Sequence, residues 1–306
     1  MVRPEHPGAL AVGPGGVLYV ADAGRQEILM RMPDGSFRAI AGTGHAGFSG
    51  DRGPATDAEL RDPAGMAVSP NGTLYFADQG NNRVRAVSPD GRITTVAGDG
   101  RFGWVKSGTR ALAAHLGSPN DVALGPGGLL YIAASDEILR LNTGGTLTRI
   151  AGNQRYEGVF GVGGRAVNAS PDGPNGLAFN RAGDLFIAGF NTKALLMVDR
   201  SGTMREPIGQ TGFYPRGTGG IVATSTGKVF AMQTQTIVTL TPTKMTTIYN
   251  FNGRRIAGIR NFLPNGLAVG ASGTIYTDTD EGNGWASGTA IVAINPNHTL
   301  SVLWTA

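Results

Sequence analysis

The sequence predicts an all-β fold, namely a six-bladed β-propeller whose blades are four-stranded antiparallel sheets. One short phrase occurs six times, at Pro7–Val12, Pro63–Val68, Pro119–Leu124, Pro174–Phe179, 218–223 and 264–269. Each copy is followed by a turn with Gly and then by a second apolar run. Gly contributes 49 of the 306 residues and charged residues only 16%, which suits strands joined by tight turns better than long helices. Six copies of one supersecondary unit indicate an array that closes on itself.

Each copy of the phrase opens a unit that divides into four strands at turn-forming residues. In the second unit the breaks are Pro70-Asn71-Gly72, Gly80-Asn81-Asn82 and Pro89-Asp90-Gly91. The first two strands of a unit are nearly all apolar, as expected of strands that pack on neighbours through both faces. We therefore expect one propeller domain over residues 1–306, with blades at about 7–42, 63–98, 119–152, 174–209, 218–250 and 264–306. Each blade is then complete in its own sequence, so the ring should close without a strand exchanged between the termini.

Three long connectors join the outermost strand of one blade to the innermost strand of the next, at roughly 42–62, 98–118 and 152–173. They are related in sequence, because Ala residues lie 8 and 5 positions before the next repeat Pro in each of them. These pairs are Ala55 and Ala58, Ala111 and Ala114, and Ala166 and Ala169. Segments 54–60 and 110–116 suit one or two helical turns, with Pro54 at a helix start. We expect short helical turns in these loops.

The composition limits the classes of protein to which the chain can belong. The chain has no Cys, which excludes disulfides, thiolate metal sites and Cys nucleophiles. No apolar run approaches the roughly 20 residues of a membrane span, so we expect no membrane insertion. Residues 1–7 lack the apolar core of a signal peptide, which leaves two expectations: a cytoplasmic protein, or an extracytoplasmic domain separated from its signal or anchor. We expect a monomer, and the net charge of +4 is only weak support for nucleic-acid binding.

Some familiar kinds of catalytic site are disfavoured. The four His residues include no pair at metal-ligand spacing, and no Gly-x-Ser-x-Gly elbow lies between a strand and a helix. Asp22, Asp78 and Asp278 each end the second strand of a blade, and we expect them to cap turns.

The segments Ala41-Gly-Thr-Gly-His-Ala-Gly-Phe-Ser-Gly-Asp-Arg-Gly-Pro-Ala-Thr56 and Asp78-Gln-Gly-Asn-Asn-Arg-Val84, followed by Thr95-Val-Ala-Gly98, resemble NHL repeats. The resemblance covers nearly all of the chain and fades in the fourth and fifth copies. It implies a six-bladed propeller. It does not imply one activity, because NHL propellers include sensor domains of bacterial kinases, RNA- or protein-binding modules, and relatives of lyases and lactonases.

The residue after the repeat Pro is Asn in three blades, as Asn120, Asn175 and Asn265. Asn carbonyl oxygens placed around a channel can bind a hard cation such as calcium, although Asn also suits strand starts for backbone reasons alone. Segments 119–123 and 174–178 resemble the metal-ligand strands of the gluconolactonase and paraoxonase superfamily. This resemblance implies Glu5 as a fourth ligand and one channel calcium, but Thr218-Gly219 stands where that superfamily has an Asp.

Aromatic and basic residues in the predicted loops are the better candidates for binding. Such side chains supply much of the energy of protein interfaces. The candidates are Phe48, Arg52, Trp104, Lys106, Tyr156, Phe160, Tyr214, Arg216 and Trp285. We expect a non-enzymatic, sensor-like recognition module that binds a protein, peptide or glycan on the long-loop face. The alternative is a calcium-dependent lactonase, esterase or lyase acting in the channel. Single-stranded nucleic acid is a third possibility that the low net charge disfavours.

Overall fold

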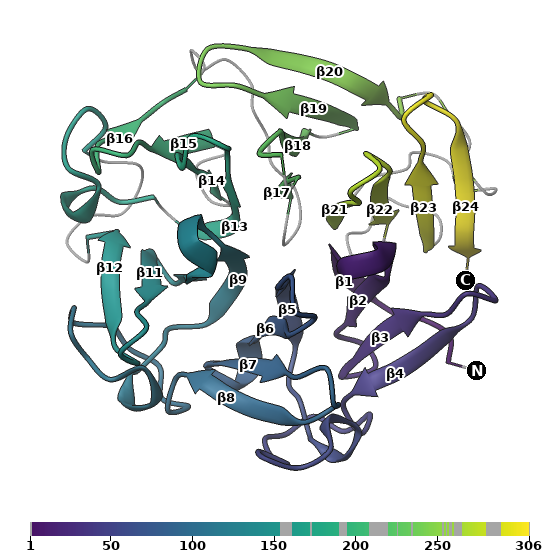
Figure 1. Cartoon of the computed structure of the whole chain (residues 1–306), viewed down its shortest axis with the longest axis horizontal. Coiled ribbons are helices and arrows are strands. Elements are labelled where there is room, and N and C mark those ends of the chain that lie inside the picture. The colour runs from purple at the N-terminus through teal and green to yellow at the C-terminus, as the bar shows by residue number, and fades with distance from the viewer. Residues whose placement is uncertain are drawn as a thin grey trace.

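A computed structural model of the chain describes residues 2–153, 161–171, 173–189, 195–207, 220–224, 226–233, 235–252, 254, 256, 259, 265–279 and 289–305. Six four-stranded antiparallel sheets lie around a central axis (Figure 1). Each sheet consists of four consecutive strands with the first strand innermost. This confirms the predicted propeller, and the ring closes without a strand exchanged between the termini.

The strands have the following bounds. Blade 1 contains β1 (Pro7–Val12), β2 (Leu18–Asp22), β3 (Glu27–Arg31) and β4 (Phe37–Ala41). Blade 2 contains β5 (Pro63–Val68), β6 (Leu74–Asp78), β7 (Arg83–Val87) and β8 (Ile93–Ala97). Blade 3 contains β9 (Pro119–Leu124), β10 (Leu130–Ala134), β11 (Glu137–Leu141) and β12 (Leu147–Ala151).

The other three blades have the same plan. Blade 4 contains β13 (Pro174–Phe179), β14 (Leu185–Gly189), β15 (Leu195–Val198) and β16 (Met204–Arg205). Blade 5 contains β17 (Ile221–Ala223), β18 (Val229–Gln233), β19 (Thr236–Leu240) and β20 (Met245–Asn250). Blade 6 contains β21 (Leu267–Val269), β22 (Ile275–Thr279), β23 (Ala290–Ile294) and β24 (Leu300–Thr305).

The innermost strands of blades 1 to 4 share an irregularity just after the repeat Pro. In blade 3, Pro119 pairs with Ala134 and Asp121 pairs with Ala133, so Asn120 is an extra residue in the strand. Asn175 is the extra residue at the same place in blade 4. A β-bulge of this kind bends the strand and redirects a side chain. The position after the Pro is thus part of a bulge in these four blades, whether it holds Asn, Gly or Ala.

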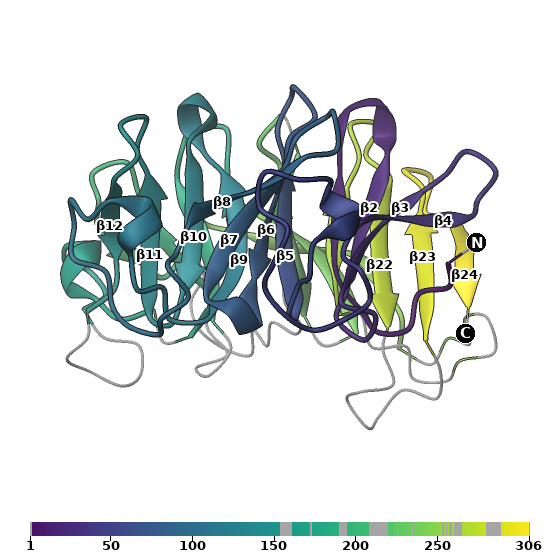
Figure 2. The same cartoon turned by 90° about the horizontal axis from the view of Figure 1, so that it is seen from below.

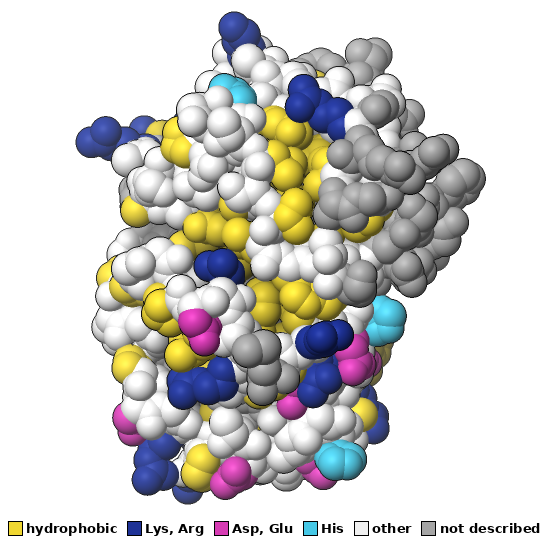
Figure 3. Space-filling view, turned by 90° about the vertical axis from the view of Figure 1, so that its right-hand side faces the viewer, with side chains coloured by type: hydrophobic (Ala, Val, Ile, Leu, Met, Phe, Trp, Pro, Cys, Tyr) yellow, Lys and Arg dark blue, Asp and Glu magenta, His cyan; other side chains and the backbone are white. Residues whose placement is uncertain are grey.

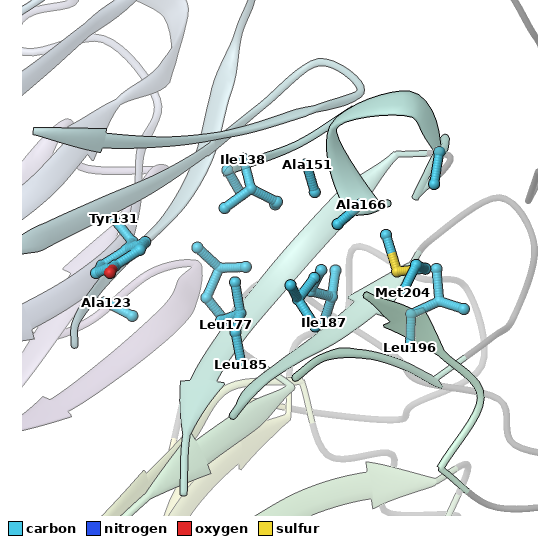
Figure 4. Packing of buried hydrophobic residues seen from close by; sticks show 13 residues of the cluster. Ala123, Tyr131, Ile138, Ala151, Ala166, Leu177, Leu185, Ile187, Leu196 and Met204 are labelled. Atoms are coloured by element: carbon cyan, nitrogen blue, oxygen red, sulfur yellow. The ribbon is translucent and has the colours of Figure 1, made fainter. Parts of the chain in front are cut away.

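The blades are held together by hydrophobic clusters between neighbouring sheets. The cluster between blades 3 and 4 includes Ile138, Leu177, Ile187, Leu196 and Met204, all buried (Figure 4). Ala166 and Ala169 of the third connector belong to the same cluster. The corresponding Ala pairs of the other two connectors are also buried in clusters. The Ala repeat in the connectors is thus a packing requirement, because a larger side chain would overfill these sites.

The three connectors have one backbone course. Each contains a 3-10 turn, η2 (Ala55–Asp57), η4 (Ala111–Ala113) or η6 (Ala166–Asn168), which confirms the predicted helical turns. The first Ala of each turn donates its backbone N–H to the outer turn of the following blade, at the carbonyl of Gly91, Gly145 or Gly202. Each connector therefore contacts the rim of the next blade before it returns to the axis.

The two faces of the ring differ in their loops. The turns after β1 and β9 lie at the top of Figure 2. Because the strands alternate in direction, the described parts of the three connectors and the turns after β2, β6 and β10 lie at the opposite face. Figure 3 views the rim on the side of β4 and β24, where hydrophobic side chains are visible between polar ones. Val302 of β24 is 46% exposed there. Among the described helices, none is long and apolar enough to cross a membrane.

Candidate functional site

We name residues 42–62 connector A and residues 98–118 connector B, and compare them position by position. Phe48 and Trp104 occupy the same position, each ten residues before the second buried Ala of its connector. Their exposed fractions are similar, at 40% and 37%. Both lie on the face predicted for ligand binding, but their surroundings differ.

Phe48 in connector A covers a buried charge network. The guanidinium carbon of Arg83 lies 3.6 Å from the centre of the Phe48 ring, and that of Arg85 lies 4.9 Å from it. Arg85 is fully buried and forms ion pairs with Asp51 at 2.9 Å and with Asp78 at 3.2 Å. Its Nη2 also donates to the carbonyl oxygen of Ser49 at 3.0 Å. The cation–π contacts and these ion pairs give Phe48 a structural role.

Asp78 joins this network to the start of blade 2. Its carboxylate accepts hydrogen bonds from the backbone N–H of Arg61 and the side chain of Asn81, both at 2.8 Å. Burial raises the pKa of Asp78, and these hydrogen bonds together with Arg85 oppose that rise. The carboxylate thereby ties the segment that leads into β5 to the turn that follows β6.

The corresponding aspartates of blades 1 and 6 make similar contacts. Asp22 accepts the backbone N–H groups of Glu5 at 2.7 Å, His6 at 3.0 Å and Arg25 at 3.1 Å. Asp278 accepts the N–H of Gly266 at 2.8 Å. The predicted turn-capping role is confirmed for Asp22, and these residues also fasten the start of the innermost strand.

Connector B exposes its large side chains instead of covering charges with them. Besides Trp104, Phe102 is 66% exposed and Leu112 is 61% exposed. Arg101, Lys106 and Arg110 are also exposed, and none of them forms an ion pair within the described part of the chain. We call these six residues, Arg101, Phe102, Trp104, Lys106, Arg110 and Leu112, the connector B surface.

The backbone beneath the connector B surface is fixed. Val105 is buried and donates its N–H to Glu137 of β11 at 3.0 Å. The Ser107 hydroxyl accepts the N–H of Arg149 in β12 at 3.0 Å. Trp104 and Lys106, both predicted from the sequence, therefore flank a buried anchor. Sequence reasoning does not single out Leu112, and the only signal for it is an apolar residue beside the two buried Ala positions.

The remaining predicted ligand-binding residues are not part of this surface. Arg52 is exposed at the rim, where its carbonyl accepts a hydrogen bond from Arg92 at 2.8 Å. The other candidates lie outside the described residues: Tyr156, Phe160, Tyr214, Arg216 and Trp285.

The predicted metal ligands have the following contacts in the structure. The Glu5 carboxylate is exposed and pairs with Arg25 at 2.9 Å. Asn120 accepts a hydrogen bond from Gln79 at 2.6 Å through Oδ1 and donates to the carbonyl of Pro174 at 3.1 Å. Asn175 is buried, and the N–H of Asn265 donates to the carbonyl of Asp278 at 2.9 Å. The described residues contain no group of three acidic or His side chains placed to hold a metal.

A sequence model of the Teneurin NHL domain matches residues 41–88. These residues comprise connector A and the first three strands of blade 2, which hold the Phe48–Arg85 network. The chain is a six-bladed β-propeller in which residues 41–88 match an NHL domain, and we refer to it as the NHL propeller. The prediction from the repeat motif is thereby confirmed.

Curated relatives of this NHL propeller are much longer proteins. Teneurin-3 of Danio rerio is 27% identical over 233 residues, which is 67% of this chain and 8% of the relative. Teneurin-1 of Gallus gallus is 63% identical over 41 residues, which is 13% of this chain and 2% of the relative. The NHL propeller thus spans less than a tenth of the relatives that it matches.

Solved structures show the same fold at low identity. A putative gluconolactonase aligns with 98% of this NHL propeller and 90% of its own chain, at 16% identity and a TM-score of 0.64. A streptogramin B lyase aligns with 98% and 83%, at 14% identity and a TM-score of 0.62. The distant similarity to gluconolactonases is confirmed for the fold alone. Connector B lies outside the segment that the family match covers.

Proposed function

We propose that this NHL propeller is a recognition module that binds a protein or peptide segment at the connector B surface. The observation that supports the proposal is the combination of three exposed apolar side chains and three unpaired cations on one loop. Aromatic and Arg side chains are the residues that most often dominate binding energy at protein interfaces.

The chemistry of the surface indicates the partner. Connector B carries three basic side chains and one acidic side chain, Asp99, whose carboxylate lies 3.4 Å from His115. A partner segment with Asp or Glu beside large apolar residues would complement both features. Leu112 favours a protein over single-stranded nucleic acid, because an aliphatic side chain provides no flat surface on which a base stacks.

The fixed backbone also favours binding. Buried Val105 and the hydrogen bonds to Glu137 and Arg149 hold the loop before any partner arrives. A loop that is already ordered loses less conformational entropy on association, so more of the contact energy appears as affinity.

The proposal is tested by selecting peptides from a random display library on the immobilised chain. We expect enrichment of peptides that combine acidic and apolar residues. Synthetic copies should bind Phe102→Ala and Trp104→Ala at least about tenfold more weakly, because truncating an interface hot spot costs about 2 kcal/mol or more. Calorimetry gives the affinities, and thermal melting shows that the variants are folded.

The matched control is Val302→Ala, which removes an exposed apolar side chain from the rim at β24. It should leave peptide affinity unchanged. Enriched peptides without acidic residues, or peptides that bind the Phe102 and Trp104 variants as well as the wild type, would contradict the proposal. A single-stranded oligonucleotide that binds the wild type and competes with the peptides would indicate that the connector B surface binds nucleic acid instead of a protein segment.

A further inference from the structure

A cavity of about 400 Å³ lies on the propeller axis. Its walls come from all six innermost strands, with Ala11, Met66, Val122, Leu177, Ile221 and Leu267 among the lining residues. It extends to residues of the turns that follow those strands, including Gly13, Pro70 and Ala271. The cavity therefore reaches the face opposite the connectors, and its volume lies within the range of small-molecule sites.

One residue of the wall differs in kind from the rest. Asp121 is the only titratable side chain among the described residues that line the cavity. The equivalent position is Gly65, Gly176 and Gly266 in three other blades, and Ala9 in blade 1. The lining positions nearest the turn face come later in the innermost strands, so Asp121 lies at the deeper, connector side.

The neighbouring blades accommodate the Asp121 carboxyl group. Oδ2 accepts the backbone N–H of Leu177 in β13 at 2.8 Å. Oδ1 lies against Gly65 in β5, where a Cβ atom would be only 2.1 Å away. Asp121 is 4% exposed, and burial raises its pKa to about 8. Burying a carboxyl group at this position costs free energy. Gly65 and Leu177, the two residues packed against it, carry no titratable side chain.

The cavity wall also presents backbone polar groups. Each innermost strand is the first strand of its sheet, so its inner edge has no strand partner in the described part of the chain. Backbone carbonyl and N–H groups alternate along such an edge. The wall therefore combines apolar side chains, backbone carbonyls and one carboxyl group, with no basic side chain among the described lining residues.

We propose that this cavity binds a small organic ammonium ion, whose N–H groups are accepted by the Asp121 carboxylate and whose hydrocarbon part contacts the apolar wall. A carboxylate and carbonyls attract a cation, whereas they repel a carboxylate ligand.

The test is calorimetric titration of the full chain with three probes of the same shape: cyclohexylamine, cyclohexanol and cyclohexanecarboxylate. At pH 8 we expect the amine to bind at least about tenfold more tightly than the alcohol, because a hydrogen bond between charged groups is stronger than one between a charged and a neutral group. The carboxylate should not bind.

Asp121→Asn should weaken amine binding at least about tenfold and change alcohol binding less than twofold, since Asn keeps an oxygen for the Leu177 N–H. Trp104→Ala is the matched control and should leave amine affinity unchanged. Equal affinity for amine and alcohol, no amine binding to the wild type, or an unchanged Asp121→Asn variant would overturn the proposal.

Discussion

Connectors A and B have the same backbone course, but their net charges have opposite signs. Connector A carries four acidic and two basic side chains, whereas connector B carries one acidic and three basic ones. The backbone N–H of Gly42 donates to Ala55 in connector A, and that of Gly98 donates to Ala111 in connector B. Connector A directs its aromatic ring onto arginines of the next blade, and connector B leaves its aromatic and basic side chains exposed.

The difference between connectors A and B shows that one type of loop can serve two functions. The Gly and Ala positions set the course of the backbone, because they pack where no larger side chain fits. The remaining positions are then free to differ. In connector A they form an internal charge network that stabilises blade 2, and in connector B they provide a surface that a partner can contact.

The largest expected effect is the loss of the Arg85 guanidinium from the connector A network. Arg85→Ala leaves Asp78 buried without its ionic partner, so we expect the free energy of unfolding to fall by about 3–5 kcal/mol. Denaturant unfolding measures the change. The control is Arg101→Ala in connector B, an exposed and unpaired Arg whose loss should cost less than about 0.5 kcal/mol. Similar values for the two variants would remove the distinction between the connectors.

The second effect concerns the shared backbone, and it should appear in both connectors. Gly42 and Gly98 have φ angles of 97° and 93°, and a Cβ at either would lie 2.3 Å from a backbone oxygen. We expect Gly42→Ala and Gly98→Ala each to cost about 2 kcal/mol or more in unfolding free energy. Gly108→Ala is the control, because Gly108 has a φ of 92° but nothing within 4 Å of its Cβ. It should cost only about 1 kcal/mol, from the backbone angle alone.

The third effect compares the same substitution in the two connectors. Phe48→Ala removes the ring that covers Arg83 and Arg85, so we expect a loss of about 1–2 kcal/mol of stability. Phe102→Ala removes a ring that is mostly in solvent and should change stability by less than about 0.5 kcal/mol. Thermal and denaturant unfolding of both variants give the comparison. An equal loss at both positions would show that the Phe102 ring has a packing role of its own.

Much of the fold was predictable because it repeats. The recurring Pro, the turn residues and the Ala spacing act locally, and each recurs in several blades. The predicted propeller, its closure and its 3-10 turns followed from that repetition. Recurrence at a fixed spacing indicates units that pack side by side, because one supersecondary unit cannot bury its hydrophobic face alone.

The site was less predictable because its contacts join residues far apart in the chain. Phe48 and Trp104 share a position and an exposed fraction, and only Arg83 and Arg85 of the next blade distinguish them. The ion pair of Glu5 with Arg25 likewise depends on the fold of blade 1 and not on any motif.

Asp121 shows the same limit at the axis. Its two neighbours, Gly65 and Leu177, lie 56 positions away in either direction. In the sequence Asp121 is only one of two departures from Gly at this position, the other being Ala9. Its burial and its raised pKa result from the packing of three blades around its carboxyl group.

The smallest expected effect concerns charge at the edge of the connector B surface. Lys106→Glu reverses an exposed, unpaired charge, so an acidic peptide selected on the wild type should associate about two- to fivefold more slowly, with its dissociation rate unchanged. Arg52→Glu in connector A is the control and should leave both rates unchanged. Surface plasmon resonance measures both rates at low and high salt. The difference between Lys106→Glu and the wild type should disappear at about 0.5 M salt, where exposed charges are screened beyond a few Å. A slower association that persists at high salt would mean that Lys106 contacts the peptide directly and does not act through long-range attraction.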